Sequence, residues 1–130
     1  MRKFIKRAAF PSAIVSALLL VACGSSNSSV PINLSPDAKA GRELAIATGC
    51  ASCHGSNGQG RVGPKFIGLA DSQVLLADGT TVTADDTYLY ESIKNPDAKR
   101  RRGATSMMPS FNLSDAEIAS IISYIRALKG

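Results

Sequence analysis

The densest cluster of reactive side chains in this 130-residue sequence is CASCH at positions 50–54, which holds two of three cysteines and the single histidine. Cys50 and Cys53 are three positions apart, and His54 is four positions after Cys50. On one turn of helix these three side chains project from neighbouring positions of the same face. That spacing is compatible with three chemistries: a thiol–disulfide redox pair, a metal site, and covalent attachment of haem.

The rest of the chain separates these alternatives. A redox C-x-x-C pair normally lies in a βαβ setting, and no strand–helix–strand alternation is visible here. A structural zinc site needs four ligands, and no cysteine or histidine follows position 54. C-x-x-C-H is the attachment pattern of c-type haem. The pattern therefore predicts one covalent haem c on Cys50 and Cys53, with His54 as an axial iron ligand. A haem-free thiol oxidoreductase is the remote alternative.

The second axial ligand has to come from another residue type, because His54 is the only histidine. A neutral thioether is the usual companion of histidine in electron-transfer haems. The segment SMMPSF at 106–111 offers Met107 and Met108 just before the C-terminal helix pattern. One of the two methionines is therefore the candidate ligand, and the other is expected to fill a gap in the core.

The first 22 residues have the pattern of a secretory signal peptide. Four basic residues among the first seven precede an apolar stretch from 8 to 22, which Pro11 interrupts. A membrane-spanning helix needs about 20 apolar residues, so a retained anchor helix is the weaker alternative. The tetrapeptide LVAC at 20–23 resembles the lipobox of bacterial lipoproteins, in which the cysteine is acylated and becomes the first mature residue.

Cys23 is accordingly the expected lipidation site. Each buried CH₂ of its acyl chains would contribute about 0.8 kcal/mol to anchoring. Residues 23–35 are rich in serine and predict a flexible tether between the lipid and a domain at 36–130. We therefore expect an exported bacterial lipoprotein, anchored on a membrane and facing the periplasm or the outer side of the cytoplasmic membrane.

Processing removes most of the positive charge. The full chain has 15 Lys and Arg against 10 Asp and Glu, and four of the basic residues lie in 1–22. The remaining 108 residues carry 11 basic and 10 acidic side chains, a net charge of +1, so nucleic-acid binding is not implied. The run KRRR at 99–102 is expected to be a solvated loop, or to help dock an acidic partner or a membrane surface.

Helix signals dominate the expected domain. Ser35, Pro36 and Asp37 begin a helix that should run to about position 48, bury Leu44 and end at Gly49. A second helix pattern places Tyr88, Leu89 and Ile93 on one face and stops before Asn95-Pro96. The C-terminal helix pattern has a capping box, Ser114 with Glu117, and a hydrophobic staple, Leu113 with Ile118. The glycine-rich segment 55–64 predicts a loop, and LADGTTV at 76–82 predicts an Asp-Gly turn between short extended pieces.

These patterns predict an all-α domain of three or more short helices with long loops. No tryptophan is present, and few large aromatic side chains are available for the interior. A core this thin suggests that a bulky apolar ligand completes it.

The segments GCASCHGSNGQGRVGPKFIGL, MPSF and LSDAEIASIISYIRAL resemble those of monohaem class I c-type cytochromes. The middle segment, LADGTTVTADDTYLYESIKNPDAK, is more specifically similar to the cytochrome c domain fused to subunit II of some haem–copper oxidases. The resemblance covers residues 36–129, although the copper-site segment of subunit II has no counterpart here. It implies a small cytochrome c fold wrapped around one haem.

The resemblance also implies roles for individual residues. The methionine directly before proline, here Met108, would be the sixth ligand, with Met107 as runner-up. The Pro64 carbonyl would accept a hydrogen bond from the Nδ1–H of His54. The first and last helices would cross, bringing Gly41 and Leu44 against Ile121 and Tyr124.

The function that follows is one-electron transfer, with no catalytic residues and no enzyme activity. We expect a membrane-tethered carrier that passes electrons from a quinol-oxidising complex or dehydrogenase to a terminal oxidase of a respiratory chain. The alternative is a haem enzyme or sensor, peroxidase-like or binding a small ligand, in which Met108 dissociates. Tyr88, Tyr90 and Arg61 are candidates for contact with haem propionates, although core or solvent roles are equally compatible with the sequence.

Overall fold

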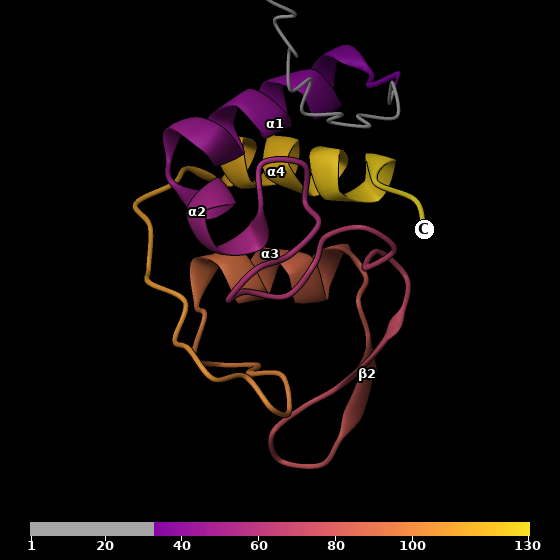
Figure 1. The fold of residues 1–130 in the computed structure, drawn as a ribbon, viewed down its shortest axis with the longest axis vertical. Helices are drawn as coiled ribbons and strands as arrows, with labels where there is room; N and C mark the ends of the chain where they lie inside the picture. Colours follow the sequence, from indigo (N-terminus) through magenta and orange to yellow (C-terminus); the bar gives the residue numbers. More distant parts are fainter. Residues whose placement is uncertain (1–32) are drawn as a thin grey trace, which may run out of the picture.

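Four helices and one β-hairpin make up the part of the chain that the structure, a computed structural model, describes, residues 33–130 (Figure 1). Three predicted features lie outside these residues: the signal peptide at 1–22, the lipidation site at Cys23 and nearly all of the tether at 23–35. In chain order the elements are α1 (Pro36–Ala47), α2 (Cys50–His54), β1 (Gln73–Leu75), β2 (Thr81–Thr83), α3 (Asp86–Lys94) and α4 (Asp115–Ala127). Within residues 33–130, no helix has the length and apolar character needed to cross a membrane.

Helix α1 begins as its sequence predicts. The Ser35 side chain accepts a hydrogen bond from the Ala38 amide at 3.3 Å, and Pro36 occupies the first turn. The helix ends one residue earlier than expected, and Leu44 is only half-buried, whereas Ala38, Gly41 and Ala45 are buried. Small side chains therefore form the buried face of α1, which lets another helix approach closely.

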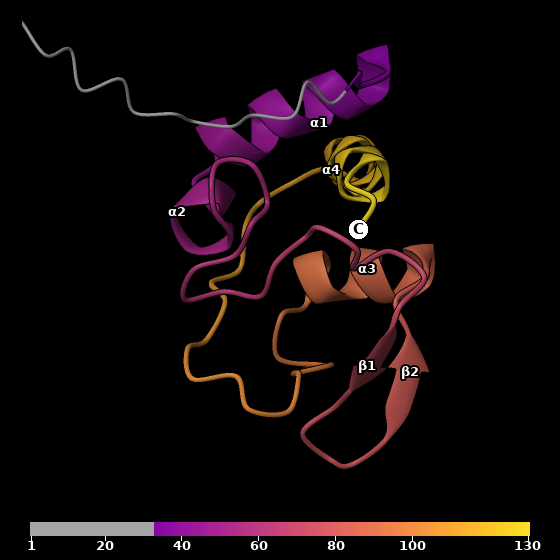
Figure 2. The same ribbon diagram turned by 45° about the vertical axis from the view of Figure 1, so that its right-hand side comes forward.

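That other helix is α4, which crosses α1 at Gly41. Figure 2 looks almost along α4, with α1 lying across it. A Cβ atom added at Gly41 would lie 1.8 Å from the Ser120 carbonyl oxygen and 3.0 Å from the Ile121 nitrogen. The predicted crossing therefore exists, and at Gly41 it is a contact between backbones.

The all-α expectation is wrong in one detail. Strands β1 and β2 form an antiparallel hairpin in the register Val74↔Val82, because Val and Thr favour a pleated, half-buried surface. The Asp-Gly turn that the sequence indicated lies between the strands. Gly79 has a φ of 91°, and the Asp78 carboxylate accepts hydrogen bonds from the backbone and hydroxyl of Thr80.

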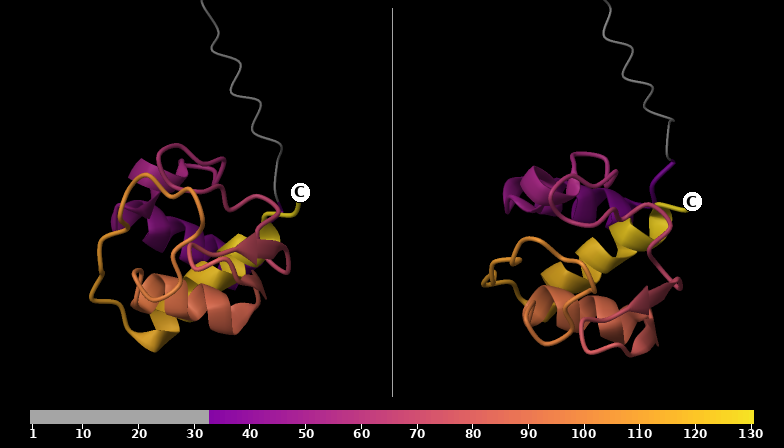
Figure 3. Two further views of the ribbon diagram at one scale, coloured as in Figure 1. Left: turned by 90° about the horizontal axis from the view of Figure 1, so that it is seen from below. Right: turned by 60° about the horizontal axis from the view of Figure 1, so that its bottom comes forward.

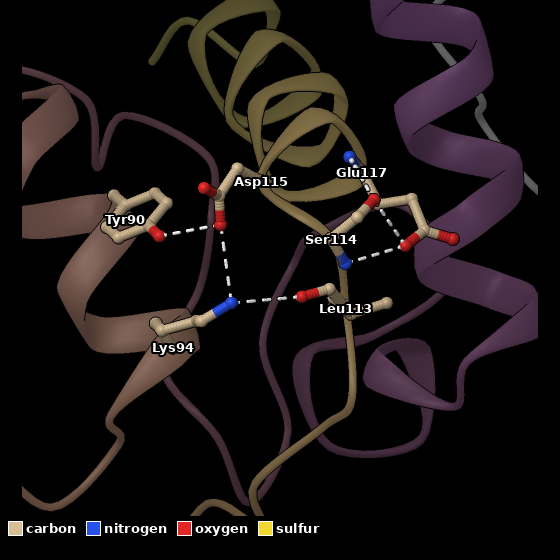
Figure 4. A network of polar contacts seen from close by, with 6 residues as sticks. All are labelled: Tyr90, Lys94, Leu113, Ser114, Asp115 and Glu117. Carbon is tan, nitrogen blue, oxygen red and sulfur yellow. Dashed lines mark hydrogen bonds and ion pairs between the residues drawn. The ribbon is translucent and has the colours of Figure 1, made fainter.

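Helix α4 is held at its N-terminus by two sets of polar contacts (Figure 4). The capping box is complete, since Ser114 Oγ accepts from the Glu117 amide and the Glu117 carboxylate accepts from the Ser114 amide. From α3, Tyr90 Oη donates to Asp115 at 2.8 Å, and Lys94 Nζ donates to the Leu113 carbonyl at 3.2 Å. These bonds fix the point where the segment between α3 and α4 rejoins the core.

We call that segment, residues 95–112, the Met loop. It arches away from α3 and α4 and lies on the same side of the molecule as α2 (Figure 3). The hydrophobic core includes the largest fully buried side chains, which are Ile118 and Ile121 of α4 and Val74 of β1. The fold therefore places the CASCH helix on the same side of the molecule as the loop that contains both candidate methionines.

Candidate functional site

Helix α2 consists of the CASCH segment alone and presents its three reactive side chains together. Gly49 precedes it with a φ of 89°, a left-handed conformation that lets the chain leave α1 and immediately begin a new helix. Cys50 and His54 are each 7% exposed, and Cys53 is half-buried. Both thiols are free, so neither is consumed by a disulfide.

The His54 imidazole is held in one orientation. Its Nδ1 lies 2.7 Å from the Pro64 carbonyl oxygen, the contact that the resemblance implies, and because a carbonyl only accepts, Nδ1 must carry the hydrogen. Nε2 is thereby left with a free lone pair. The ring stacks on Phe66, with centroids 4.4 Å apart and planes at 18°. Burial lowers the pKa of His54 below its usual range, and the Pro64 hydrogen bond raises it in part.

The glycine-rich loop after α2 packs its backbone directly against the histidine. The Gly60 amide donates to the His54 carbonyl at 2.7 Å, and the Gly63 amide donates to the Cys53 carbonyl at 2.9 Å. A Cβ added at Gly63 would lie 3.0 Å from His54 Cε1. This is closer than ordinary van der Waals contact, so glycine at 63 lets the loop pass the imidazole without displacing it and bring the Pro64 carbonyl to Nδ1.

A cavity of about 590 Å³ opens beside α2. Cys50, Cys53 and His54 contribute to its wall, together with apolar side chains of α3 and α4 and residues of the Met loop. Met107 and Met108 both line it from that loop, although Met107 is 68% exposed and Met108 is half-buried. The fold thus brings Cys50, Cys53, His54, Pro64 and both candidate methionines to one cavity.

The side chains of the cavity fit a haem. Two free thiols and an imidazole with an available Nε2 lie on one wall, and two thioether sulfurs come from another segment. One polar atom in the wall is also left without a partner, because Ser92 Oγ of α3 is buried and makes no hydrogen bond. Within residues 33–130, no three side chains of His, Cys, Asp and Glu gather into a group that could hold a bare metal ion.

The three residues named as candidates for propionate contact differ in their position relative to the cavity. Tyr88 does line the cavity, but Tyr90 is bonded to Asp115, and Arg61 is exposed and not part of the cavity wall. The wall instead includes Ser92 and the arginines of the basic run at 99–102. Helical periodicity could have indicated Ser92, which is four residues after Tyr88 and three after Leu89 and therefore lies on the same face of α3.

Comparison with known proteins agrees with this geometry. The family model described as cytochrome c matches residues 38–129. Two relatives, each named cbb3-type cytochrome c oxidase subunit CcoP, come from Helicobacter pylori and from Helicobacter pylori strain 52. Each is 33% identical over 92 residues, a stretch that covers 68% of this chain and 27% of the relative. The chain therefore matches about a quarter of the length of these relatives. It belongs to the cytochrome c family, whose domain implies covalently bound haem c.

Proposed function

We propose that this protein is a membrane-tethered one-electron carrier with a single haem c, ligated by His54 and Met108. The observation that carries the proposal is the convergence of the CASCH helix, the Pro64-bonded imidazole and the two methionines on one cavity. A haem held there supplies reversible exchange of one electron between Fe(II) and Fe(III).

Each residue of the site would have a separate role in binding the haem. Cys50 and Cys53 provide the thioether attachments, one from a buried and one from a half-buried position. The Pro64 carbonyl fixes the tautomer of His54 and makes its Nε2 a better donor to a metal. Phe66 stacks on the imidazole and limits its rotation. A histidine held in this way would move little if the charge of a bound iron changed.

Met108 is the better candidate for the second ligand. It is half-buried, whereas Met107 has 68% of its surface exposed, and both are in the cavity wall. If His54 and Met108 both bound the iron, these two residues would leave no ligand position free for a substrate. This is why we propose a carrier and not an enzyme.

The relatives support a respiratory partner. Both are named as subunits of a cbb3-type cytochrome c oxidase, and we infer that this chain delivers electrons to a terminal oxidase. A quinol-oxidising complex or a dehydrogenase would be its electron donor. A lipid on Cys23 and the tether at 23–35 would confine the domain to the outer side of the cytoplasmic membrane or to the periplasm, where such partners are accessible.

The ligand assignment is tested by substitution. Met108→His should retain covalent haem and lower the reduction potential by on the order of 0.1 V, within the roughly 0.8 V that axial ligands span. It should also abolish the near-infrared sulfur-to-iron band of the oxidised protein. Met107→Leu is the matched control and should change neither. An unchanged band in Met108→His, with loss in Met107→Leu, would assign the ligand to Met107.

A further inference from the structure

The basic run at 99–102 is a fixed part of the cavity wall and is not a free loop. The Ala77 amide donates to the Arg100 carbonyl, and the Arg102 amide donates to the Leu75 carbonyl, each at 2.9 Å. Between these bonds, Arg101 is paired with Leu76 in an antiparallel bridge. The Met loop is therefore bonded to the residues at the end of β1 through an isolated bridge, just where the three arginines occur.

This pairing decides which way each arginine points. Residues directly opposite each other in an antiparallel pair have side chains on the same face, and successive residues alternate between faces. Leu76 is 6% exposed, so its partner Arg101 lies on the inner face. By this alternation the side chains of Arg100 and Arg102 lie on the other face, and both are exposed whereas Arg101 is half-buried, although all three residues border the cavity.

Arg101 places a positive charge on the inner face, and no acidic side chain among residues 33–130 forms an ion pair with it. Lys99, its neighbour in the run, is paired with Glu91 at 2.7 Å. Among residues 33–130, no carboxylate lies within ion-pair distance of Arg101, and Asp97, the acidic residue of the cavity wall, is not paired with it. A partly buried cation without a partner is unfavourable unless something else neutralises it.

A second polar group in the same wall also lacks a partner. Serines within a helix commonly donate to the carbonyl four residues earlier, as Ser120 and Ser123 of α4 do. Ser92 of α3 makes no such bond, although its Oγ is buried. Arg101 and Ser92 are both donors, and an acceptor-rich, negatively charged ligand group would satisfy both.

We propose that Arg101 binds a propionate carboxylate of the haem and that Ser92 provides a second hydrogen-bond donor to the propionates. The inference rests on the proposed haem site and adds residues that the resemblance did not supply. A guanidinium suits this role because its two parallel N–H groups match a carboxylate, and its charge is permanent. By holding positive charge near the iron, Arg101 disfavours Fe(III) and raises the reduction potential.

The test compares Arg101→Gln with Arg102→Gln in the haem-loaded, full-length protein. Arg102 also borders the cavity, but its side chain is exposed, so Arg102→Gln removes the same charge one residue away, from the other face of the bridge. We expect Arg101→Gln to shift the Fe(III)/Fe(II) equilibrium about tenfold toward Fe(III), which is 59 mV for one electron, and Arg102→Gln to shift it clearly less. The propionate bending band in the resonance Raman spectrum should move in Arg101→Gln and stay in Arg102→Gln.

Two further variants keep the test decisive. Arg101→Lys retains the charge but loses the planar guanidinium group. The reduction potential should therefore stay near the wild-type value while the propionate band still moves. Ser92→Ala should move the same band with a smaller change in potential, because no charge is removed. Equal shifts of potential in the two glutamine variants, or an unmoved band in Arg101→Gln, would overturn the proposal. Wild-type protein without a Soret band or without the mass of a covalent haem would instead overturn the proposed function.

Discussion

Replacing Gly41 by alanine probes the helix crossing that supports the whole site. The new Cβ would lie 1.8 Å from the Ser120 carbonyl oxygen and 2.4 Å from its carbon, both of them backbone atoms that cannot rotate away. Ordinary contact begins at 3.4 Å, so α1 and α4 would have to separate locally by about 1.6 Å. Overpacking of this kind costs roughly 1–3 kcal/mol, and the immobile neighbours place Gly41→Ala at the upper end.

Helix propensity acts in the opposite direction. Alanine is better than glycine inside a helix by about 1 kcal/mol. The expected net loss is therefore about 2 kcal/mol, which for a domain of this size lowers Tm by about 8–16 °C. The sign of the change distinguishes the two effects, because propensity alone would make the variant more stable.

The assay is thermal and guanidinium unfolding of the haem-loaded protein, followed by far-ultraviolet circular dichroism. Ala40, the preceding residue, is exposed in the same helix, and Ala40→Gly should lose about 1 kcal/mol through propensity alone. If Gly41→Ala unfolds at or above the wild-type midpoint, the backbone contact does not limit the packing of α1 on α4. The reasoning about the crossing would then be refuted.

Two other changes test the cap of α4 and the proposed anchor. The hydrogen bonds from the Ser114 backbone and side chain lower the pKa of Glu117 below its usual 4.5, so the stability they provide is present above that pH and is lost on acidification. Glu117→Ala should therefore lower Tm by about a few degrees at pH 7, and its difference from wild type should shrink by about pH 3; a constant difference would contradict the cap. Cys23→Ser should move the protein from the membrane fraction to the soluble fraction with its Soret band intact, and a variant that stays with the membrane would exclude lipid anchoring through this residue.

The haem-attachment motif and the helix ends were readable from sequence because they depend on local spacing. C-x-x-C-H places its three side chains on one helical turn whatever surrounds them. The caps at Ser35 and Ser114 act within four residues, and the structure forms both. The Asp-Gly turn was also readable, although the flanking strands were too short to outweigh the helical signals and the domain was expected to be all-α.

Other properties depend on residues that are distant in sequence. Met107 and Met108 are adjacent and chemically identical, and only the path of the Met loop leaves one exposed and the other half-buried. The run KRRR looks uniform, yet pairing with Leu76, 25 positions earlier, leaves Arg101 half-buried while Arg100 and Arg102 are exposed. Residue type and local spacing were enough to identify the atoms that could bind a haem, because neither depends on the rest of the fold. The exposure of each arginine and each methionine follows instead from the packing of segments that are far apart in the chain, and local patterns do not encode that packing.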